Sequence, residues 1–338
     1  MSTVGSGAGG AAGSGAGGAA GSGAALTIGV DVGGTSIRAA VVDADGQVLD
    51  TAQSPTPRSS PALEDALDRT VRELVARHPI GAVGLAVAGF VSRDRTVVRF
   101  APHLPWTNAP VADDLAARLG LPVALEHDAN AAAWAERRFG AATGSGNVVT
   151  VAVGTGIGAA LLVDGELYRG SNGVAPELGH LQVVPDGRLC ACGKRGCWER
   201  YCSGTALVET AIELLAADPA GSTVLAADVA RDPGSLTGRR IAGAARDGDP
   251  VALRTMAEFA RWLGLGLAIV ADVFDPELVV IAGGVASSSG LFLDDARDHY
   301  ARALTGSGHR PLARIRTTQL GEAAAMVGAA DLARTLLV

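Results

Sequence analysis

The sequence predicts an α/β protein made of two similar halves with a cleft between them. A strand, a Gly-rich turn and a second strand begin directly after residue 25, and the same pattern returns after Gly140. Each of these hairpins is followed by segments with helical periodicity, an alternation typical of α/β folds. A single dinucleotide-binding sheet is the competing architecture. However, no strand near the amino end runs through G-x-G-x-x-G directly into a helix.

Composition and charge exclude several classes of protein. Hydrophobic residues make up 48% of the 338 residues and charged residues 19%, which is enough to bury a core and excludes a wholly disordered chain. An uncharged apolar run of about 18 residues is lacking, so we expect no membrane span. The net charge of −7 and the lack of a dense Lys/Arg run predict no nucleic-acid partner.

Residues 1–25 are almost entirely Gly, Ala and Ser, and the unit GSGAGGAA occurs twice in succession. Such a segment has little to bury and high backbone entropy, so we expect a flexible tail. An artificial linker is the competing explanation. A signal peptide is not expected, because no basic region precedes an apolar stretch.

The first half is predicted from its apolar runs and turn residues. Leu26–Val32 and Ile37–Val42 have the composition of buried strands, and Gln47–Gln53 completes a meander. Ser60-Pro61 begins a helix that runs to about Arg77, with serine as the cap, proline in the first turn and acidic residues following. A strand, an amphipathic helix, a short strand and an Ala-rich helix complete this half: Ala82–Ala88, Ala109–Leu119, Val123–Glu126 and Ala129–Phe139.

The second half begins near residues 140–146. Strands at Asn147–Val153 and Ala159–Val163 flank its Gly-rich turn, and a buried strand at Leu278–Ile281 ends in Ala-Gly-Gly. Helices are expected at Thr205–Ala217, Pro250–Phe274 and Glu322–Leu337. The predicted domains are a small N-terminal domain at 26–140 and a larger C-terminal domain at 141–321, with the helix at about 322–338 returning to the first domain.

Two Gly-rich turns are candidate phosphate sites. Glycines allow backbone N–H groups to approach an anion closely, Thr35 adds a hydroxyl, and Asp31 has the chemistry to hold Mg²⁺. A tight β-hairpin is the plain structural alternative at both turns. The candidate residues are Asp31, Gly33, Gly34 and Thr35 in the first turn and Gly154, Thr155, Gly156 and Gly158 in the second.

A third glycine pair, Gly283-Gly284, ends a buried strand and would let a nucleotide base or ribose approach, although strand ends often carry glycines. A Walker A motif is absent, as is a protein-kinase signature. One Gly-rich hairpin per half instead predicts a nucleotide held across the cleft. This arrangement resembles the actin-like ATPase (ribonuclease H-like) fold of the actin-like ATPase and sugar kinase superfamily.

Asp128 directly precedes the Ala-rich helix. Its simplest role is a helix N-cap, since a carboxylate satisfies free N–H groups at the positive helix end. Its functional role would be that of a base at the domain junction, because phosphoryl transfer needs a positioned acceptor for the attacking hydroxyl's proton. The two roles are compatible.

The cysteines form a cluster with metal-ligand character. His180, Cys190, Cys192 and Cys197 provide the Cys₃His donor set of a structural zinc site within a loop at 180–199. Buried free cysteines are the alternative, and Cys202 is one thiol more than zinc needs. Such clustering differs from a disulfide framework and predicts a reducing compartment, hence a cytoplasmic protein.

Together these segments resemble the ROK family (repressors, uncharacterised reading frames and sugar kinases), and within it the bacterial ATP-dependent glucokinases. The matching stretches follow the family order from about residue 28 to the carboxyl end. They are DVGGTSIRAAVVD, VAGFV, LPW, EHDANAAAWAERRFG, VAVGTGIGAALLVDGELYRGSNGVAPELGHLQVVPDGRLCACGKRGCWERYCSG and IAGGV. The combination of E-x-G-H with C-x-C-G-x₂-G-C-x-E is highly specific.

The resemblance implies a role for each candidate. Asp128 is the general base toward the primary hydroxyl of the sugar, and His180 both ligates zinc and binds sugar. Glu177 and Glu199 accept hydrogen bonds from sugar hydroxyls, and Gly89 lies along the sugar site. The two Gly-rich turns hold Mg–ATP, and Gly283 and Gly284 lie near the adenosine. A homodimer is also expected from the resemblance.

Two positions depart from the family pattern. His127 and His103 stand where family glucokinases usually have asparagine, and both are expected near the sugar. We therefore expect an ATP-dependent hexose kinase acting at the 6-hydroxyl, with glucose as substrate. The alternatives are a kinase for mannose, fructose or an N-acetylhexosamine, and a weakly catalytic sugar-binding protein. Repressors of the family carry a winged helix-turn-helix before the first turn, where this sequence has its Gly/Ala/Ser stretch, so a repressor is not expected.

Overall fold

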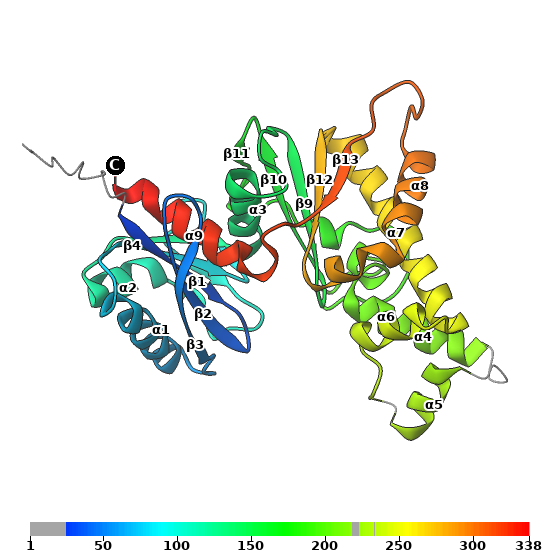
Figure 1. Cartoon of the computed structure of the whole chain (residues 1–338), viewed down its shortest axis with the longest axis horizontal. Helices are drawn as coiled ribbons and strands as arrows, with labels where there is room; N and C mark the ends of the chain where they lie inside the picture. The colour runs from blue at the N-terminus through cyan, green and yellow to red at the C-terminus, as the bar shows by residue number, and fades with distance from the viewer. Residues whose placement is uncertain (1–24, 218–222, 233, 338) are drawn as a thin grey trace, which may run out of the picture.

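The computed structural model describes residues 25–217, 223–232 and 234–337. The expected flexible tail at 1–25 lies outside the described residues, except for Ala25. The described chain forms two lobes, each with a five-stranded sheet, rather than the single sheet of the competing architecture (Figure 1).

The first sheet has the order β3-β2-β1-β4-β8, with β1–β3 antiparallel and β4 and β8 parallel to β1. Helices α1 (Ser60–Val75) and α2 (Val111–Leu119) pack their apolar faces on one side of it. The cap of α1 is Ser59, without a side-chain hydrogen bond, rather than Ser60. The strands are β1 (Leu26–Val32), β2 (Ser36–Val42), β3 (Val48–Pro55), β4 (Ile80–Val87) and β8 (Val123–His127).

The second sheet has the order β11-β10-β9-β12-β13, and β9, β12 and β13 are parallel. Its outer face is covered by long helices whose apolar residues form the larger hydrophobic core. Its strands are β9 (Val148–Val153), β10 (Ile157–Val163), β11 (Glu166–Leu167), β12 (Leu278–Ala282) and β13 (Arg314–Thr317). The helices of this lobe are α4 (Gly204–Ala217), α5 (Val224–Arg231), α6 (Gly238–Arg246), α7 (Pro250–Phe274) and α8 (Leu293–Ala303).

Short elements complete the chain. A three-stranded sheet is formed by β5 (Phe90–Val91), β6 (Val98–Phe100) and β7 (Thr107–Ala109). The 3₁₀ helices are η1 (Leu178–His180), η2 (Trp198–Arg200), η3 (Gly284–Leu291), η4 (Gly321–Ala323) and η5 (Thr335–Leu337). Most of these were not expected, because two or three residues carry no measurable hydrophobic period. In the described residues, every helix is too short or too polar to cross a lipid bilayer.

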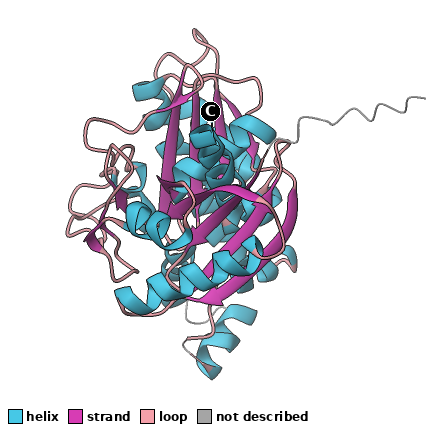
Figure 2. Ribbon diagram, turned by 90° about the vertical axis from the view of Figure 1, so that its left-hand side faces the viewer, coloured by secondary structure: helices cyan, strands magenta, loops and turns pink. Residues whose placement is uncertain are grey.

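Two helices lie between the sheets, α3 (Asp128–Phe139) and α9 (Ala324–Arg334) (Figures 1 and 2). The closing helix α9 is shorter than the expected Glu322–Leu337, because a 3₁₀ turn precedes it and another follows it. It packs on the first sheet. A Cβ at Gly29 would lie 1.7 Å from Met326 O, and one at Gly84 would lie 1.9 Å from Ala329 O. Glycine is needed there because the backbone of α9 lies directly on β1 and β4.

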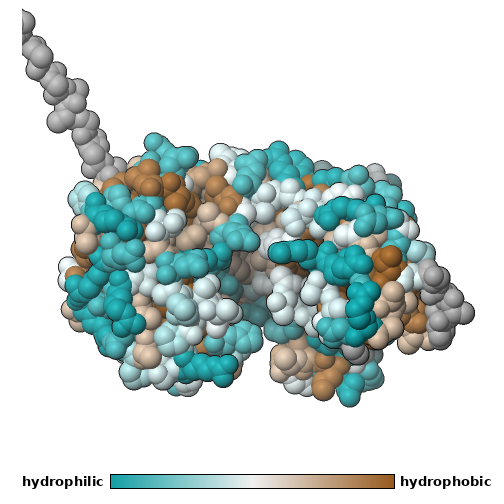
Figure 3. All heavy atoms as spheres, turned by 60° about the horizontal axis from the view of Figure 1, so that its bottom comes forward, coloured by the Kyte–Doolittle hydropathy of each residue, from teal (hydrophilic) through white to brown (hydrophobic). Residues whose placement is uncertain are grey.

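The two connections between the lobes meet at Glu136, a carboxylate that is 1% exposed near the end of α3. Its Oε2 accepts from Ala141 N at 2.7 Å, where the chain passes into the second sheet. Its Oε1 accepts from Leu320 N at 2.9 Å, where the chain returns toward α9. The buried side chain of Glu136 thus hydrogen-bonds both connections between the lobes. The surface is visibly hollowed between the lobes (Figure 3).

Candidate active site

The sequence-predicted residues gather at the carboxyl ends of parallel strands. In the first sheet, Val32, Val87 and His127 lie in register at the ends of β1, β4 and β8. The residues that follow these strands include the first Gly-rich turn, Gly89 and Asp128. In the second sheet, Ala152 of β9 pairs with Ala282, the last residue of β12, so the second turn and the Gly283-Gly284 pair follow neighbouring strand ends. Open α/β sheets bind ligands at this edge.

The first Gly-rich turn joins β1 to β2. Gly33 N donates to Ser36 O at 3.1 Å, and Gly33 O accepts from Thr56 Oγ1 at 2.6 Å. Gly34 and Thr35 are exposed. A Cβ at Gly34 would lie 2.8 Å from His103 Cβ, so His103 lies directly beside this turn. The backbone of the turn is held in shape while its tip stays open.

Asp31 lies at the base of this turn and pairs with Arg38, with 2.6 Å between Oδ2 and Nη2. Burial raises the pKa of Asp31 above its ordinary value, Arg38 partly opposes this, and the neighbouring carboxylate of Asp128 adds to it. Burial therefore destabilises the ionised form of Asp31 more than Arg38 stabilises it. A further cation beside Asp31 would stabilise the ionised form.

Asp128 is the first residue of α3, and His127 occupies the cap position. Asp128 Oδ1 accepts from Ala129 N at 2.8 Å and lies 3.1 Å from His127 Nε2. The side chain is 37% exposed, so a ligand has access to it. A carboxylate that is both fixed by the helix N-terminus and open to a ligand is placed as a general base must be.

The second Gly-rich turn is fixed from the side of α4. Gly154 O accepts from Gly204 N at 2.7 Å, and Thr155 O accepts from Thr205 Oγ1 at 2.8 Å. A Cβ at Gly158 would lie 3.7 Å from Ala129 Cβ, which brings β10 against the start of α3. The second turn and Asp128 are thereby close neighbours, although distant in sequence.

Gly283 has a φ of +80°, and a Cβ there would lie 2.4 Å from Val153 O. The backbone at the end of β12 therefore touches the end of β9, and only glycine fits. Gly284 begins η3 and has open space around its Cβ direction. This pair thus lies beside the second turn.

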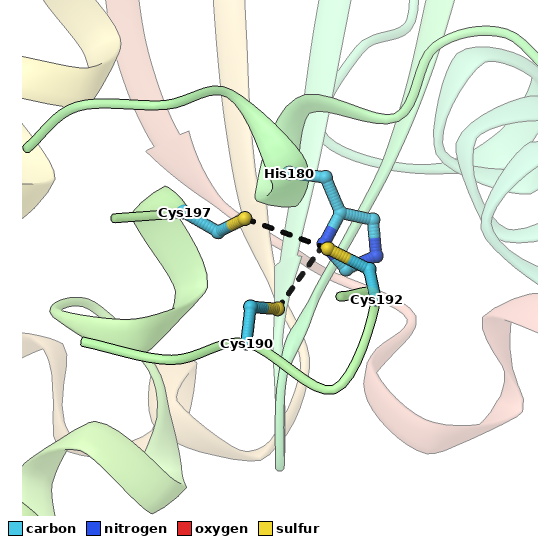
Figure 4. A group of neighbouring side chains, drawn as sticks. All are labelled: His180, Cys190, Cys192 and Cys197. Atoms are coloured by element: carbon cyan, nitrogen blue, oxygen red, sulfur yellow. Dashed lines mark hydrogen bonds between the residues drawn. The ribbon is translucent and has the colours of Figure 1, made fainter. Parts of the chain in front are cut away.

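Four donor atoms converge in the loop after β11 (Figure 4). His180, Cys190, Cys192 and Cys197 place one ligand atom each, all within 4.8 Å of one another. The Sγ atoms of Cys192 and Cys197 are 3.6 Å apart, and Cys190 Sγ lies 3.7 Å from His180 Nδ1. A tetrahedral zinc ion with bonds of about 2.3 Å needs ligands about 3.8 Å apart, so the cluster fits zinc. Cys202 is fully buried in the apolar core, and burial raises its pKa well above the ordinary value.

Glu199 connects this cluster to the second turn. Its Oε1 lies 3.0 Å from Cys190 Sγ, and its Oε2 accepts from Ile157 N at 3.3 Å. A Cβ at Gly156 would lie 2.4 Å from Glu199 Oε2. Glycine is therefore needed at position 156, because any larger side chain would clash with the Glu199 carboxylate.

Glu177 lies across the junction from Asp128. Together with Gly89, His127 and Asn130 it lines a cavity of about 10 Å³, the size of one water molecule. Burial raises the pKa of Glu177, and His127 and His180 partly oppose this shift. The structure thus brings Gly89, His127 and Glu177 together, whereas His103 lies at the first turn.

Sequence reasoning missed three polar residues at this junction: Glu126, Asn130 and Arg169. Glu126 and Asn130 are buried, and Glu126 pairs with Arg169 across the junction. Their only sequence signal is that Glu126 and Asn130 flank Asp128 by two residues on each side.

Comparison with known proteins agrees with this geometry. The ROK family profile matches residues 27–336. A glucokinase of Streptomyces coelicolor is 47% identical over 309 residues, covering 91% of this chain and 98% of the relative. A ROK family glucokinase from Streptomyces griseus, solved in complex with glucose and AMPPNP, has a TM-score of 0.81 and 46% identity, covering 92% of this chain and 99% of that one. A xylose repressor of Bacillus subtilis is 28% identical, covering 80% of this chain and 67% of the repressor.

The extent of these matches settles the fold. Structural neighbours that span nearly the whole chain, including a ROK hexokinase from Thermus thermophilus with a TM-score of 0.76, have the actin-like ATPase fold with two domains. The fold class expected from the two Gly-rich hairpins is confirmed. With its family profile matched from residue 27 to residue 336, the chain belongs to the ROK family.

Proposed function

We propose that this protein is a glucokinase that transfers the γ-phosphoryl group of ATP to the 6-hydroxyl of glucose. The single observation that carries the proposal is the position of Asp128. The next residue, Ala129, lies against Gly158 of the second Gly-rich turn, and His127 and Asn130 on either side of Asp128 line the Glu177 cavity. The 47% identity to the Streptomyces coelicolor glucokinase, and the glucose and AMPPNP in the Streptomyces griseus glucokinase, support the same reaction.

Asp128 acts as the general base. The 6-hydroxyl oxygen attacks the γ-phosphorus, its proton passes to the Asp128 carboxylate, and the bond between the γ-phosphorus and the bridging oxygen breaks to leave ADP. The hydrogen bond from Ala129 N holds the Asp128 carboxylate in place before the transfer. Closure of the two lobes around the hollow excludes water, which would otherwise accept the phosphoryl group.

The two Gly-rich turns bind the nucleotide. Backbone N–H groups of Gly34 and Thr35 in the first turn and of Thr155 and Gly156 in the second bind the phosphates. Gly33, Gly154 and Gly158 let the backbone approach the nucleotide closely, and Gly283-Gly284 takes the adenosine. Mg²⁺ bound with ATP would neutralise charge on the phosphates. Asp31 is the carboxylate that fits it, because burial leaves its charge incompletely compensated.

The sugar lies on the other side of Asp128. Glu177 and Glu199 accept hydrogen bonds from its hydroxyls and His180 donates one, with Gly89, His127 and His103 along its edges. A zinc ion on His180, Cys190, Cys192 and Cys197 would fix the loop that carries these carboxylates and would take no part in the chemistry. Thiolate ligands persist in a reducing compartment, so we place the protein in the cytoplasm. We also propose a homodimer, testable by light scattering.

The test is a sugar panel read by ADP release. Glucose, mannose, fructose and N-acetylglucosamine are each supplied with Mg–ATP, and glucose should give the highest kcat/KM. A preference for another hexose would assign the alternative that the departures at His127 and His103 suggest. ATP turnover that no sugar stimulates would instead identify a sugar-binding protein without kinase activity.

A further inference from the structure

Glu126 is a buried carboxylate near the end of β8 whose two oxygens are both hydrogen-bonded. It is 3% exposed. Its Oε2 accepts two hydrogen bonds from Arg169, from Nε at 2.9 Å and from Nη2 at 2.6 Å. Its Oε1 accepts from Asn130 Nδ2 at 2.9 Å and from His127 N at 3.1 Å. The carboxylate thus holds the backbone and the first helical turn on both sides of Asp128.

Arg169 begins the segment at 169–177, which we call the Glu177 loop because it ends at that residue. The loop runs from β11 to η1 and leaves the second lobe to touch the first. A Cβ at Gly173 would lie 2.4 Å from Val91 O, so the backbones of the two segments are in direct contact there. Its last residues line the water-sized cavity together with Gly89 and Asn130. The loop therefore depends on the first lobe for its position.

The geometry of the Glu126–Arg169 pair can fix the position of one segment relative to another. A guanidinium that meets one carboxylate through two N–H groups fixes an angle as well as a distance, which a lysine cannot do. Burial of the Glu126 charge offsets much of its attraction to the half-buried Arg169, so stability alone is a weak reason for such a pair. What the pair does accomplish is to join the strand that presents Asp128 to the loop that presents Glu177.

We propose that Glu126 and Arg169 are positioning residues that set the separation between Asp128 and Glu177, and thereby the affinity for the sugar. The proposal rests on the assignment of glucose phosphorylation made above. It gives no role to either residue in binding ATP, because their side-chain hydrogen bonds within the described residues go to each other, His127, Asn130 and Leu167 rather than to a Gly-rich turn.

The test compares Arg169→Ala with a matched control, Arg138→Ala. Arg138 also pairs with a buried carboxylate, Asp331, at 3.0 Å, but between α3 and α9. Arg169→Ala should raise the KM for glucose about tenfold or more and leave the KM for ATP within about twofold. Arg138→Ala should lower the Tm without raising the KM for glucose relative to the KM for ATP.

Rescue separates positioning from general destabilisation. Arg169 borders an open cavity of about 380 Å³ that also touches Arg93, Tyr168 and Ser171. Added ethylguanidinium should enter it and restore much of the kcat/KM for glucose in Arg169→Ala, and should leave Arg138→Ala unchanged. If the single variant fails to fold, Glu126→Gln with Arg169→Met removes both charges and leaves none unpaired. This double variant should fold and still show the raised KM for glucose.

Hydrogen exchange supplies a readout that needs no substrate. Amides of the Glu177 loop should exchange faster in Arg169→Ala than in the wild type and in Arg138→Ala. Equal changes in the KM values for glucose and ATP, or unchanged exchange in the loop, would overturn the positioning role. A wild type that does not phosphorylate glucose would overturn the proposed function, while the exchange comparison would still test the loop.

Discussion

His127 Nε2 lies 3.1 Å from Asp128 Oδ1, so the residue that caps α3 contacts the carboxylate that follows it. Both side chains are presented at the carboxyl end of β8, where the strand stops and the helix begins. The proposed base and a departure from the family pattern are therefore in contact. Each can be tested separately.

Asp128→Asn keeps the shape of the side chain, and its carbonyl oxygen can still accept from Ala129 N. It removes the proton acceptor. We expect kcat to fall about a hundredfold or more while nucleotide affinity and Tm stay near their wild-type values. Steady-state kinetics, calorimetric titration with a non-hydrolysable ATP analogue and thermal melting measure the three quantities. A kcat close to that of the wild type would show that Asp128 is not the proton acceptor and has only a structural role at the start of α3.

His127 and His103 should affect which hexose the protein prefers. An imidazole holds its donor and its acceptor on a rigid ring, whereas an asparagine amide is shorter and carries both at its end. Asp128 lies beside His127, so the imidazole adds bulk next to the proposed base. We expect the ratio of kcat/KM for glucose to kcat/KM for other hexoses to be lower in the wild type than in His127→Asn with His103→Asn.

The two single variants should differ, because His103 lies beside the first turn at Gly34 rather than beside Asp128. His127→Asn alone should shift the hexose ranking toward glucose more than His103→Asn alone does. The measurement is kcat/KM for several hexoses in the wild type, the two single variants and the double variant. Identical rankings in all four proteins would show that both histidines are neutral replacements.

The metal cluster predicts about one zinc ion per chain by elemental analysis. Cys192→Ala should lower both the zinc content and the Tm, because metal binding is coupled to folding of the loop. Cys202→Ala is the matched control, since Cys202 is buried in the apolar core outside the cluster. It should lower the Tm through a small cavity and keep the zinc. A metal-free protein that is stable and active would contradict the assignment.

Asp31 and Asp50 should affect stability in opposite directions. Burial raises the pKa of Asp31 above its ordinary value of 3.8, so its contribution is favourable below pH 3.8 and is lost as the pH rises through the folded pKa. The hydrogen bond from His78 lowers the pKa of Asp50, so its contribution is favourable above pH 3.8 and is lost as the pH falls through the folded pKa.

Asp31→Asn should therefore raise the Tm at pH 7 while abolishing kinase activity, and the gain should disappear near pH 3. Asp50→Asn should lower the Tm at pH 7, and the loss should disappear over the same range. Thermal melts of the three proteins across this pH interval measure both effects. A lower Tm for Asp31→Asn at pH 7 would show that the Arg38 pair outweighs the burial of the carboxylate.

Several elements were predictable because their signal is local. The apolar run Leu26–Val32 is β1 to the residue, and Pro250–Phe274 is α7 to the residue. The helices α5, α6 and α8 were missed. In α6 the sequence GRRIAGAAR offers a single large apolar residue, Ile241, and its small alanines bury only because α7 packs against them.

The sequence by itself determined the chemistry of the molecule: the two Gly-rich turns, the carboxylate of Asp128 before its helix, and the Cys₃His spacing. Each of these lies within a few residues or one loop, so residue type and spacing express it. Only the tertiary structure decided which groups meet. The contact of His103 with Gly34, that of Glu199 with Gly156 and the pairing of Glu126 with Arg169 join segments from separate strands and lobes. Such contacts follow from how the sheets and α3 pack, which depends on the whole buried surface rather than on any local pattern.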